Sequence, residues 1–343
     1  HDTLNQNTGG NNTALGVNAL KVNTSGEDNC SIGVNSLVAN TTGDDNIALG
    51  NNSLAANTTG SNNVGIGHNS LNDNTTASNL TAVGKDALGT NTTGGENTAV
   101  GYISLFDNTT GSRNTAIGNF SLESNTTGND NTGLGKGALQ KTTTASNNTA
   151  VGSAALKENT TGHSNVAVGS GALDANTTAS FNVGVGFSSL GANTTGDRNV
   201  ALGYEAMFTN TVGDRSVAIG MQALYSQNPT SNADMNNIAI GHASAFNTTT
   251  GTNNTAIGTN SLFANTTGTT NTAVGDQAAK SATTADRITA IGHFSGQAIT
   301  TGNDNVCVGA NSLDATTTGT NNVAVGSFSL GANTTASNNT AIG

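Results

Sequence analysis

One short pattern of hydrophobic and polar positions recurs along the whole chain. A small residue, an aliphatic residue and Gly follow one another twenty times, and the Gly falls at regular intervals from Gly16 to Gly343. Eighteen of the nineteen intervals are 17 residues long, and the remaining one, Gly220 to Gly241, is 21. A fixed period this short is typical of a solenoid, in which each repeat forms one coil.

Each repeat carries the signals of short strands and turns. The consensus is N-T/V-A-V/I-G-x-x-S/A-L-x-x-N-T-T-G/A-x-x, with alternating β-branched and small residues before the Gly. Leu and Thr-Thr predict a second strand, and two small or Gly positions predict corners. We therefore expect an all-β fold, a parallel β-solenoid or β-roll of about twenty 17-residue coils. It would form a single repeat array over residues 1–343, with an irregular 21-residue unit at 221–241.

Strand alternation predicts which side chains line the coil. The position directly before the Gly is always Val, Ile or Leu, as in Leu15 and Ile342, whereas the position two before it is only Ala, Gly, Ser or Cys. These neighbours point to opposite faces. We expect the aliphatic residue to face inward against the Leu four residues after the Gly, and the small residue to pack against a sister chain. Cys30 and Cys307 are expected to be buried free thiols in small slots.

Asn and Thr also recur in fixed places. Asn begins the strand in 17 of the 20 repeats, and the first Thr of Thr-Thr is present in every regular repeat. Identical polar groups stacked coil over coil can satisfy one another's hydrogen bonds. The sequence therefore predicts amide and hydroxyl ladders along the stack.

Composition excludes several classes of protein. The 343 residues carry a net charge of −11, only 9% are charged, 3% are aromatic and 45 are Gly. Ten dispersed basic residues form no cationic stripe for nucleic acid, and no apolar run is long enough to insert into a membrane. The chain has neither a G-x-S-x-G nor a G-x-x-x-x-G-K-[ST] motif. We expect no catalytic residue, no cofactor and no enzyme activity.

Several repeats resemble those of a known family. The segments 46–50, 165–169 and 322–326 resemble the head repeats of trimeric autotransporter adhesins (YadA-like), although the 17-residue period is longer than in those heads. The pattern extended by Ser-Leu-x-x-Asn-Thr-Thr-Gly is similar to repeats of phage tail-fibre proteins. The resemblance implies a homotrimer that acts as a structural shaft and mediates attachment to a host cell or surface. It places the protein in a virion tail or at the cell surface, with a host-surface glycan or receptor bound through a tip outside this segment.

Two alternative functions stay open. Stacked Thr ranks suggest a monomeric Thr-rich ice-binding β-solenoid, although ice-binding faces need Thr-x-Thr on one flat side and these Thr residues are adjacent. The other alternative is a subunit of an extracellular filament. Because the chain starts and stops inside a repeat, we expect it to be a segment of a longer fibre protein.

Four carboxylates form one candidate binding site. Glu27 and Asp28 occupy the same positions as Asp44 and Asp45 on the adjacent coil, about 4.8 Å away. Like charges so close repel one another unless a cation or a proton intervenes. The interpretations are a calcium site and a solvated acidic patch.

Four aromatic residues form the second candidate. The position after Leu is aromatic in four consecutive repeats, at Phe208, Tyr225, Phe246 and Phe263. They flank the insertion 226–237, which contains the only Pro of the chain. An aromatic strip is a plausible surface for stacking sugars, and shielding beneath an irregular loop is the alternative.

Overall fold

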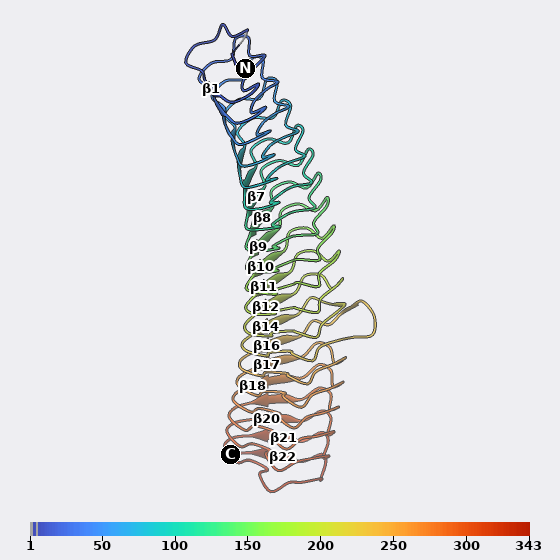
Figure 1. Cartoon of the computed structure of the whole chain (residues 1–343). Coiled ribbons are helices and arrows are strands. Elements are labelled where there is room, and N and C mark those ends of the chain that lie inside the picture. The colour runs from blue at the N-terminus through green and yellow to red at the C-terminus, as the bar shows by residue number, and fades with distance from the viewer. Residues whose placement is uncertain (1–2, 5) are drawn as a thin grey trace. The chain divides into compact units, whose positions relative to one another are not determined.

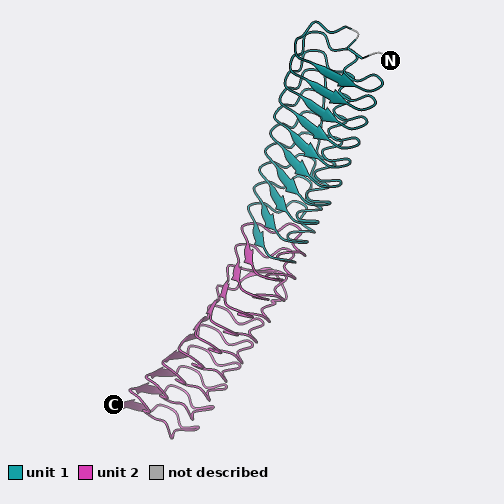
Figure 2. Cartoon of the chain, turned by 60° about the vertical axis from the view of Figure 1, so that its left-hand side comes forward, with its two compact units in different colours: residues 1–170 teal, residues 171–343 magenta. Residues whose placement is uncertain are grey.

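The chain forms two compact units, residues 1–170 and 171–343, in the computed structural model (Figures 1 and 2). The structure describes residues 3–4 and 6–343, and these contain 22 β-strands and no helix. No segment of this described part is therefore a helix suited to crossing a membrane.

The strands of unit 1 are β1 (Thr13–Leu15), β2 (Cys30–Ile32), β3 (Ile47–Leu49), β4 (Val64–Ile66), β5 (Thr81–Val83), β6 (Thr98–Val100), β7 (Thr115–Ile117), β8 (Thr132–Leu134), β9 (Thr149–Val151) and β10 (Val166–Val168). The strands of unit 2 are β11 (Val183–Val185), β12 (Val200–Leu202), β13 (Gly213–Asp214), β14 (Val217–Ile219), β15 (Ala233–Asp234), β16 (Ile238–Ile240), β17 (Thr255–Ile257), β18 (Thr272–Val274), β19 (Thr289–Ile291), β20 (Val306–Val308), β21 (Val323–Val325) and β22 (Thr340–Ile342).

Each three-residue strand pairs in parallel with its counterpart on the next coil of the same unit. In β6 and β7, for example, Ala99 lies opposite Ala116 and Val100 opposite Ile117. The register is one full repeat, so chemically similar side chains stack directly over one another. The 21-residue unit does not disturb it, because β14 pairs with β16 across the insertion. The predicted parallel β-solenoid is confirmed in each unit.

The predicted orientation of the strands is wrong. Positions are numbered here from the repeat Gly, so that the small residue is at −2 and the aliphatic residue at −1. The small residue faces inward, and Ala116 has no exposed surface, whereas Ile117 is 38% exposed. A Cβ at Gly133, which holds the −2 position of the next coil, would lie 2.6 Å from Ser121 Oγ and 3.5 Å from Leu122 Cδ1. Leu122 and Ser121 thus already fill the interior, and only a small residue fits beside them.

The residues at −3 and −1 form an outer strand face. They are Thr, Val, Ile or Leu in most coils, and they alternate with the buried −2 residue along each strand. The following members are each at least 36% exposed: Leu15, Ile47, Leu49, Ile117, Leu134, Val166, Ile219, Ile238, Ile240, Ile257, Ile291 and Ile342. The small −2 residues therefore pack against their own chain, and the aliphatic residues of the outer strand face are the ones that meet solvent.

The second predicted strand is also wrong. In each coil two residues at +2 and +4 adopt left-handed backbone conformations, such as Ile103 with φ 55° and Leu105 with φ 52°. These residues turn the chain instead of extending it. A third left-handed residue stands at −5, at Arg113 with φ 58°. Backbone hydrogen bonds still link these turns between coils, as from Leu105 N to Ser121 O at 2.9 Å.

The repeat Gly is required by both conformation and space. Gly118 has φ 132°, and a Cβ there would lie 2.6 Å from the carbonyl oxygen of Gly135 on the next coil. Left-handed φ values of this kind are essentially restricted to Gly. The Gly after Thr-Thr differs, because its constraint is the neighbouring coil: a Cβ at Gly111 would lie 2.4 Å from Gly128 O. The first corner is confirmed, and the second is a close contact between coils.

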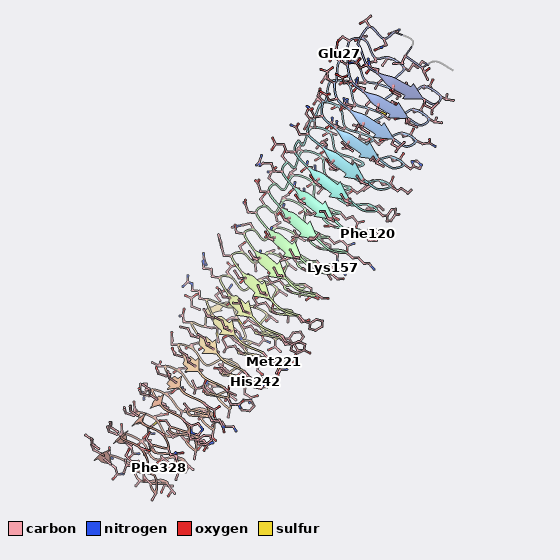
Figure 3. The ribbon with its side chains drawn as sticks, turned by 90° about the vertical axis from the view of Figure 1, so that its left-hand side faces the viewer. Glu27, Phe120, Lys157, Met221, His242 and Phe328 are labelled. Atoms are coloured by element: carbon pink, nitrogen blue, oxygen red, sulfur yellow. The ribbon has the colours of Figure 1, made fainter. Side chains whose placement is uncertain are left out.

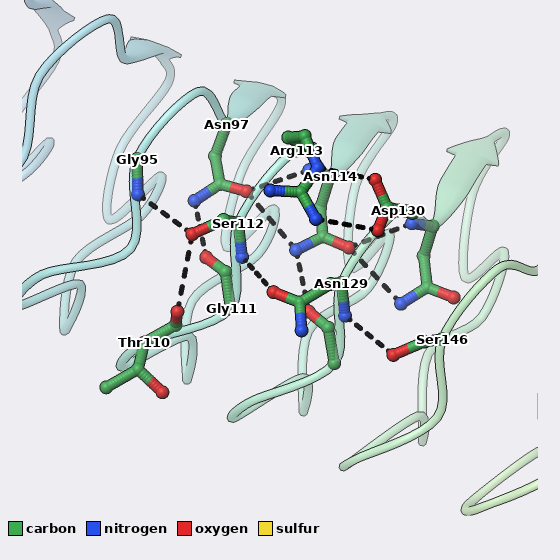
Figure 4. A network of polar contacts seen from close by, with 12 residues as sticks. Gly95, Asn97, Thr110, Gly111, Ser112, Arg113, Asn114, Asn129, Asp130 and Ser146 are labelled. Carbon is green, nitrogen blue, oxygen red and sulfur yellow. Dashed lines mark hydrogen bonds and ion pairs between the residues drawn. The ribbon is translucent and has the colours of Figure 1, made fainter.

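Two buried Asn ladders run along the coils, and Figure 4 shows part of the one at the strand start, which the sequence predicted. In the first ladder, the backbone N–H of Asn114 donates to Asn97 Oδ1 at 2.9 Å, and the side-chain amide of Asn114 donates to Gly128 O at 2.8 Å. The second ladder joins the Asn that precedes Thr-Thr, as from Asn108 Nδ2 to Asn91 Oδ1 at 2.7 Å. Both ladders lie in the interior, where an unpaired amide would be costly.

The Thr ladder differs in its acceptor. In most coils the first Thr of the pair donates its hydroxyl to the backbone carbonyl of the corresponding Thr on the next coil, as from Thr109 Oγ1 to Thr126 O at 3.0 Å. The second Thr, such as Thr110, is exposed. The first Thr of each pair thus supports the stacking of the backbone, and the second faces solvent.

Candidate binding surfaces

The four acidic candidates take part in backbone geometry. Asp44 Oδ1 accepts a hydrogen bond from the backbone N–H of Glu27 at 2.8 Å. Asp28 and Asp45 each stand at −5 with φ 55°, a conformation that Asp tolerates. Across residues 3–4 and 6–343, no three His, Cys, Asp or Glu side chains gather into a group that could hold a metal ion.

The role of Asp44 recurs in other coils with neutral side chains. At the same position, Ser112 Oγ accepts from Gly95 N at 3.2 Å, and Asn129 Oδ1 accepts from Ser112 N at 2.8 Å (Figure 4). The position selects for a hydrogen-bond acceptor, which carboxylate, amide and hydroxyl groups all supply. This repetition favours a structural role for the carboxylate at position 44.

The four aromatic candidates form a continuous stack in unit 2. The ring centroids of Phe208 and Tyr225 are 5.6 Å apart, those of Tyr225 and Phe246 are 5.0 Å apart, and those of Phe246 and Phe263 are 5.4 Å apart. The interplanar angles are between 3° and 22°. Because the inner rings of the stack cover each other's faces, the ladder offers mainly ring edges to a ligand. Glycan binding at this site stays a prediction, and stacking on a free ring face is restricted to the two ends.

The insertion beside this stack is anchored by polar groups. Gln227 Oε1 accepts from Ser216 Oγ at 3.2 Å and from Asn237 Nδ2 at 3.0 Å, and Gln227 is fully buried. Met235 is also buried, and a Cβ at Gly213 would lie 3.0 Å from its Cγ. The strand pair β13–β15 connects the insertion to the coil before it. The 21-residue repeat is therefore an ordered part of unit 2.

A second exposed row was not predicted from the sequence. The residues at +1 in three consecutive coils of unit 2 are Phe187, Tyr204 and Met221, which are 51%, 47% and 46% exposed. The rings of Phe187 and Tyr204 stack with centroids 5.5 Å apart. The signal was present in the repeat alignment, where large side chains follow the Gly in consecutive coils.

Unit 1 contains a hollow on its turn segments. Its volume is about 370 Å³, and it is lined by Phe120, Lys136, Gly137, Gln140, Ser153, Ala154 and Lys157. These residues come from positions +1, +2 and +5 of three consecutive coils, which the solenoid brings side by side. In Figure 3, Phe120 and Lys157 lie along the same edge of the unit, and Glu27 lies along the opposite edge. None of these residues was predicted from the sequence to form a site.

Comparison with protein families and with curated proteins gives no relative. No protein-family model matches the chain, and no curated protein matches it either. The likeness to adhesin and tail-fibre repeats therefore rests on the repeat motifs alone.

Proposed function

We propose that the chain is the shaft of a homotrimeric attachment fibre, of the kind found in phage tail fibres and bacterial surface adhesins. The observation that carries the proposal is the outer strand face, which places two β-branched or aliphatic side chains per coil toward solvent. Ile117 and Leu134 on adjacent coils are 38% and 43% exposed. Contiguous apolar surface of this kind is typical of protein interfaces.

The periodicity of the face favours identical chains as partners. The same two positions repeat at each parallel strand pair, as in Val100 and Ile117. A partner that covers the face needs side chains at the same spacing, and a second or third copy has them. Symmetric association of identical chains is also the commonest form of oligomer. The shaft would stand on a virion tail or a cell surface and hold a receptor-binding tip outside this segment.

Light scattering tests the association. We expect a mass of three times the 33.8 kDa of the chain. A variant with Val100, Ile117 and Leu134 all changed to Lys should lose mass toward a single chain while its circular dichroism stays unchanged, because charges on the outer strand face oppose its burial. A wild-type mass of 33.8 kDa at every concentration would contradict the trimer.

The matched control places the same charges elsewhere on the same coils. The second Thr residues Thr93, Thr110 and Thr127 are exposed and lie outside the outer strand face. Changing all three to Lys adds the same charge in the same unit, and the mass should stay that of the wild type. Equal loss of mass in both triple variants would point to a general charge effect and would refute the proposed interface.

One observation favours ice binding as a second candidate. The −3 position of five consecutive coils carries a partly exposed Thr on the same strand face as an aliphatic residue, so that these Thr side chains share one face. These residues are Thr81, Thr98, Thr115, Thr132 and Thr149. Thermal hysteresis by a monomeric chain, lost on changing Thr115 and Thr132 to Lys, would support this candidate. A trimer without hysteresis would exclude it.

A further inference from the structure

The hollow of unit 1 is lined by two consecutive coils that carry a very small residue at +2. Asn is the commonest residue at this position, and it occurs at Asn18, Asn35, Asn52, Asn69, Asn260 and Asn311. Gly137 and Ala154 replace it on consecutive coils. Gly137 retains the left-handed backbone of the position, with φ 66°. The coil path is thus kept while the volume of the side chain is removed.

One wall of the hollow is an aromatic ring. Phe120 stands at +2 on the coil before Gly137, and Tyr102 contacts it edge to face, with centroids 5.5 Å apart. The next coil supplies Gly137 at the same position, and Gly has no side chain to cover the ring. This differs from the aromatic stack of unit 2, where neighbouring rings cover one another. Phe120 can therefore offer a ring face to a ligand.

The hollow is also a basic spot in an acidic chain. Three of the six lysines of the sequence lie within residues 136–157. Lys136 makes no ion pair with a described carboxylate. Lys157 Nζ is 3.6 Å from Glu158 Oε1, and Lys141 holds the other oxygen of that carboxylate at 2.5 Å. Lys136 is thus free to bind an anion, and Lys157 is only weakly engaged.

Gln140 adds a directional polar group. Its Nε2 donates to Glu123 Oε2 at 2.7 Å, which fixes the orientation of the amide. Its Oε1 lies 3.4 Å from where a Cβ of Gly137 would stand, so the carbonyl oxygen borders the hollow. An amide oxygen held in this way accepts hydrogen bonds from hydroxyl groups.

We propose that this hollow binds a pyranose that carries a carboxylate, as in the uronic acid units of an acidic glycan. The Phe120 face would pack on the C–H groups of the sugar ring, Lys136 and Lys157 would pair with the carboxylate, and Gln140 would accept from a hydroxyl. A hollow of about 370 Å³ lies within the range of small-ligand sites. The inference places glycan recognition on the repeat array itself and does not depend on whether the chains associate.

Titration calorimetry of the full chain with trigalacturonate tests the proposal, with the neutral trisaccharide galactotriose as the reference ligand. We expect the acidic trisaccharide to bind roughly tenfold or more tightly than the neutral one, a difference of ~1.4 kcal/mol or more. The variant Lys136→Gln should lose most of this preference. The matched control Lys85→Gln, at +1 of another coil, should keep it. Absence of binding, or equal binding of both trisaccharides to the wild type, would overturn the proposal.

Filling the hollow provides the sharper test. Gly137→Asn restores the commonest residue of the position, and Asn tolerates left-handed backbone, so the variant should fold with unchanged circular dichroism. Trigalacturonate affinity should fall about tenfold or more, the equivalent of ~1.4 kcal/mol. Ala154→Asn should act in the same direction. Phe294→Leu, at the same position in unit 2, should bind as the wild type does. Unchanged affinity in both Asn variants would refute the site, whatever the mass of the assembly.

Discussion

The inner and outer faces of the same strands follow different rules. On the inside, Ala116 is fully buried and the position accepts only small residues in all coils. On the outside, Thr115 and Ile117 are partly exposed; the −3 position is Thr, Val or Ile in every coil except that of Cys30, and the −1 position is Val, Ile or Leu. The interior of the coil is narrow, so the −2 residue must be small. Extra methylene groups in a close-packed interior are destabilising. The outer face selects for β-branched shape.

The two cysteines fall on opposite faces and probe this difference directly. Cys307 at −2 is fully buried, and burial raises the pKa of its thiol to about 12. Cys30 at −3 is partly exposed, so its prediction as a buried thiol was wrong. At pH 8 only ~10⁻⁴ of Cys307 would be thiolate, and the thiolate is the reactive form.

Alkylation with iodoacetamide at pH 8, followed by peptide mass mapping, should therefore label Cys30 at least about a hundredfold faster than Cys307. Both should react alike in urea. Dilution should speed the reaction of Cys30 if association covers it, and it should leave Cys307 unchanged. Since the folded-state pKa of Cys307 is raised from 9.0, the stability it contributes is complete below pH 9 and is lost as the pH rises toward 12. Equal labelling of both thiols in the native chain would contradict the assignment of faces.

Leucines on the two faces allow the same substitution to be compared. Leu122 has no exposed surface, whereas Leu134 on the outer strand face is 43% exposed. Leu122→Ala should lower the free energy of unfolding by about 2–5 kcal/mol, because it leaves a cavity. Leu134→Ala should lower it by about 1 kcal/mol or less. Urea unfolding followed by circular dichroism measures both, with the mass recorded so that the assembly state is matched. Equal losses of unfolding free energy in the two variants would contradict the placement of Leu122 inside the coil and Leu134 on its outer face.

Added volume separates the faces in the opposite direction. Ala116→Val inserts two methyl groups at a fully buried position of the coil and should destabilise the chain by about 1–3 kcal/mol. Ile117→Val, one position further along the strand, removes one methylene from a partly exposed side chain and should change stability by less than about 1 kcal/mol. The same unfolding experiment compares the two variants. A tolerated Val at position 116 would restore the aliphatic-inside interpretation of the sequence.

The sequence determined some of these features and left others open. The period predicts the solenoid, the register and the Asn ladders, because identical residues at 17-residue spacing stack. Alternation places −1 and −2 on opposite faces but does not say which faces inward; that depends on the space left by Leu at +4. Asn and Asp recur at −5 and +2, and their tolerance of left-handed backbone is a signal for turns that could have excluded the second strand. The hollow at Gly137 requires the folded chain, since only the coil brings positions +1, +2 and +5 together.

The interior ladder can also be repaired where the sequence breaks it. Asn125 Oδ1 and Thr142 Oγ1 are both buried without a hydrogen-bond partner, because Thr142 replaces the Asn that would donate to Asn125. Thr142→Asn restores the donor at a position built for Asn, and it should raise the free energy of unfolding by about 1 kcal/mol. Thr127→Asn makes the same exchange at an exposed position of the neighbouring coil and should change stability by less than about 0.5 kcal/mol. If the two variants have the same free energy of unfolding, the stacked amides do not stabilise the interior. The packing of the small residues at −2 and of the Leu at +4 must then hold the coils together.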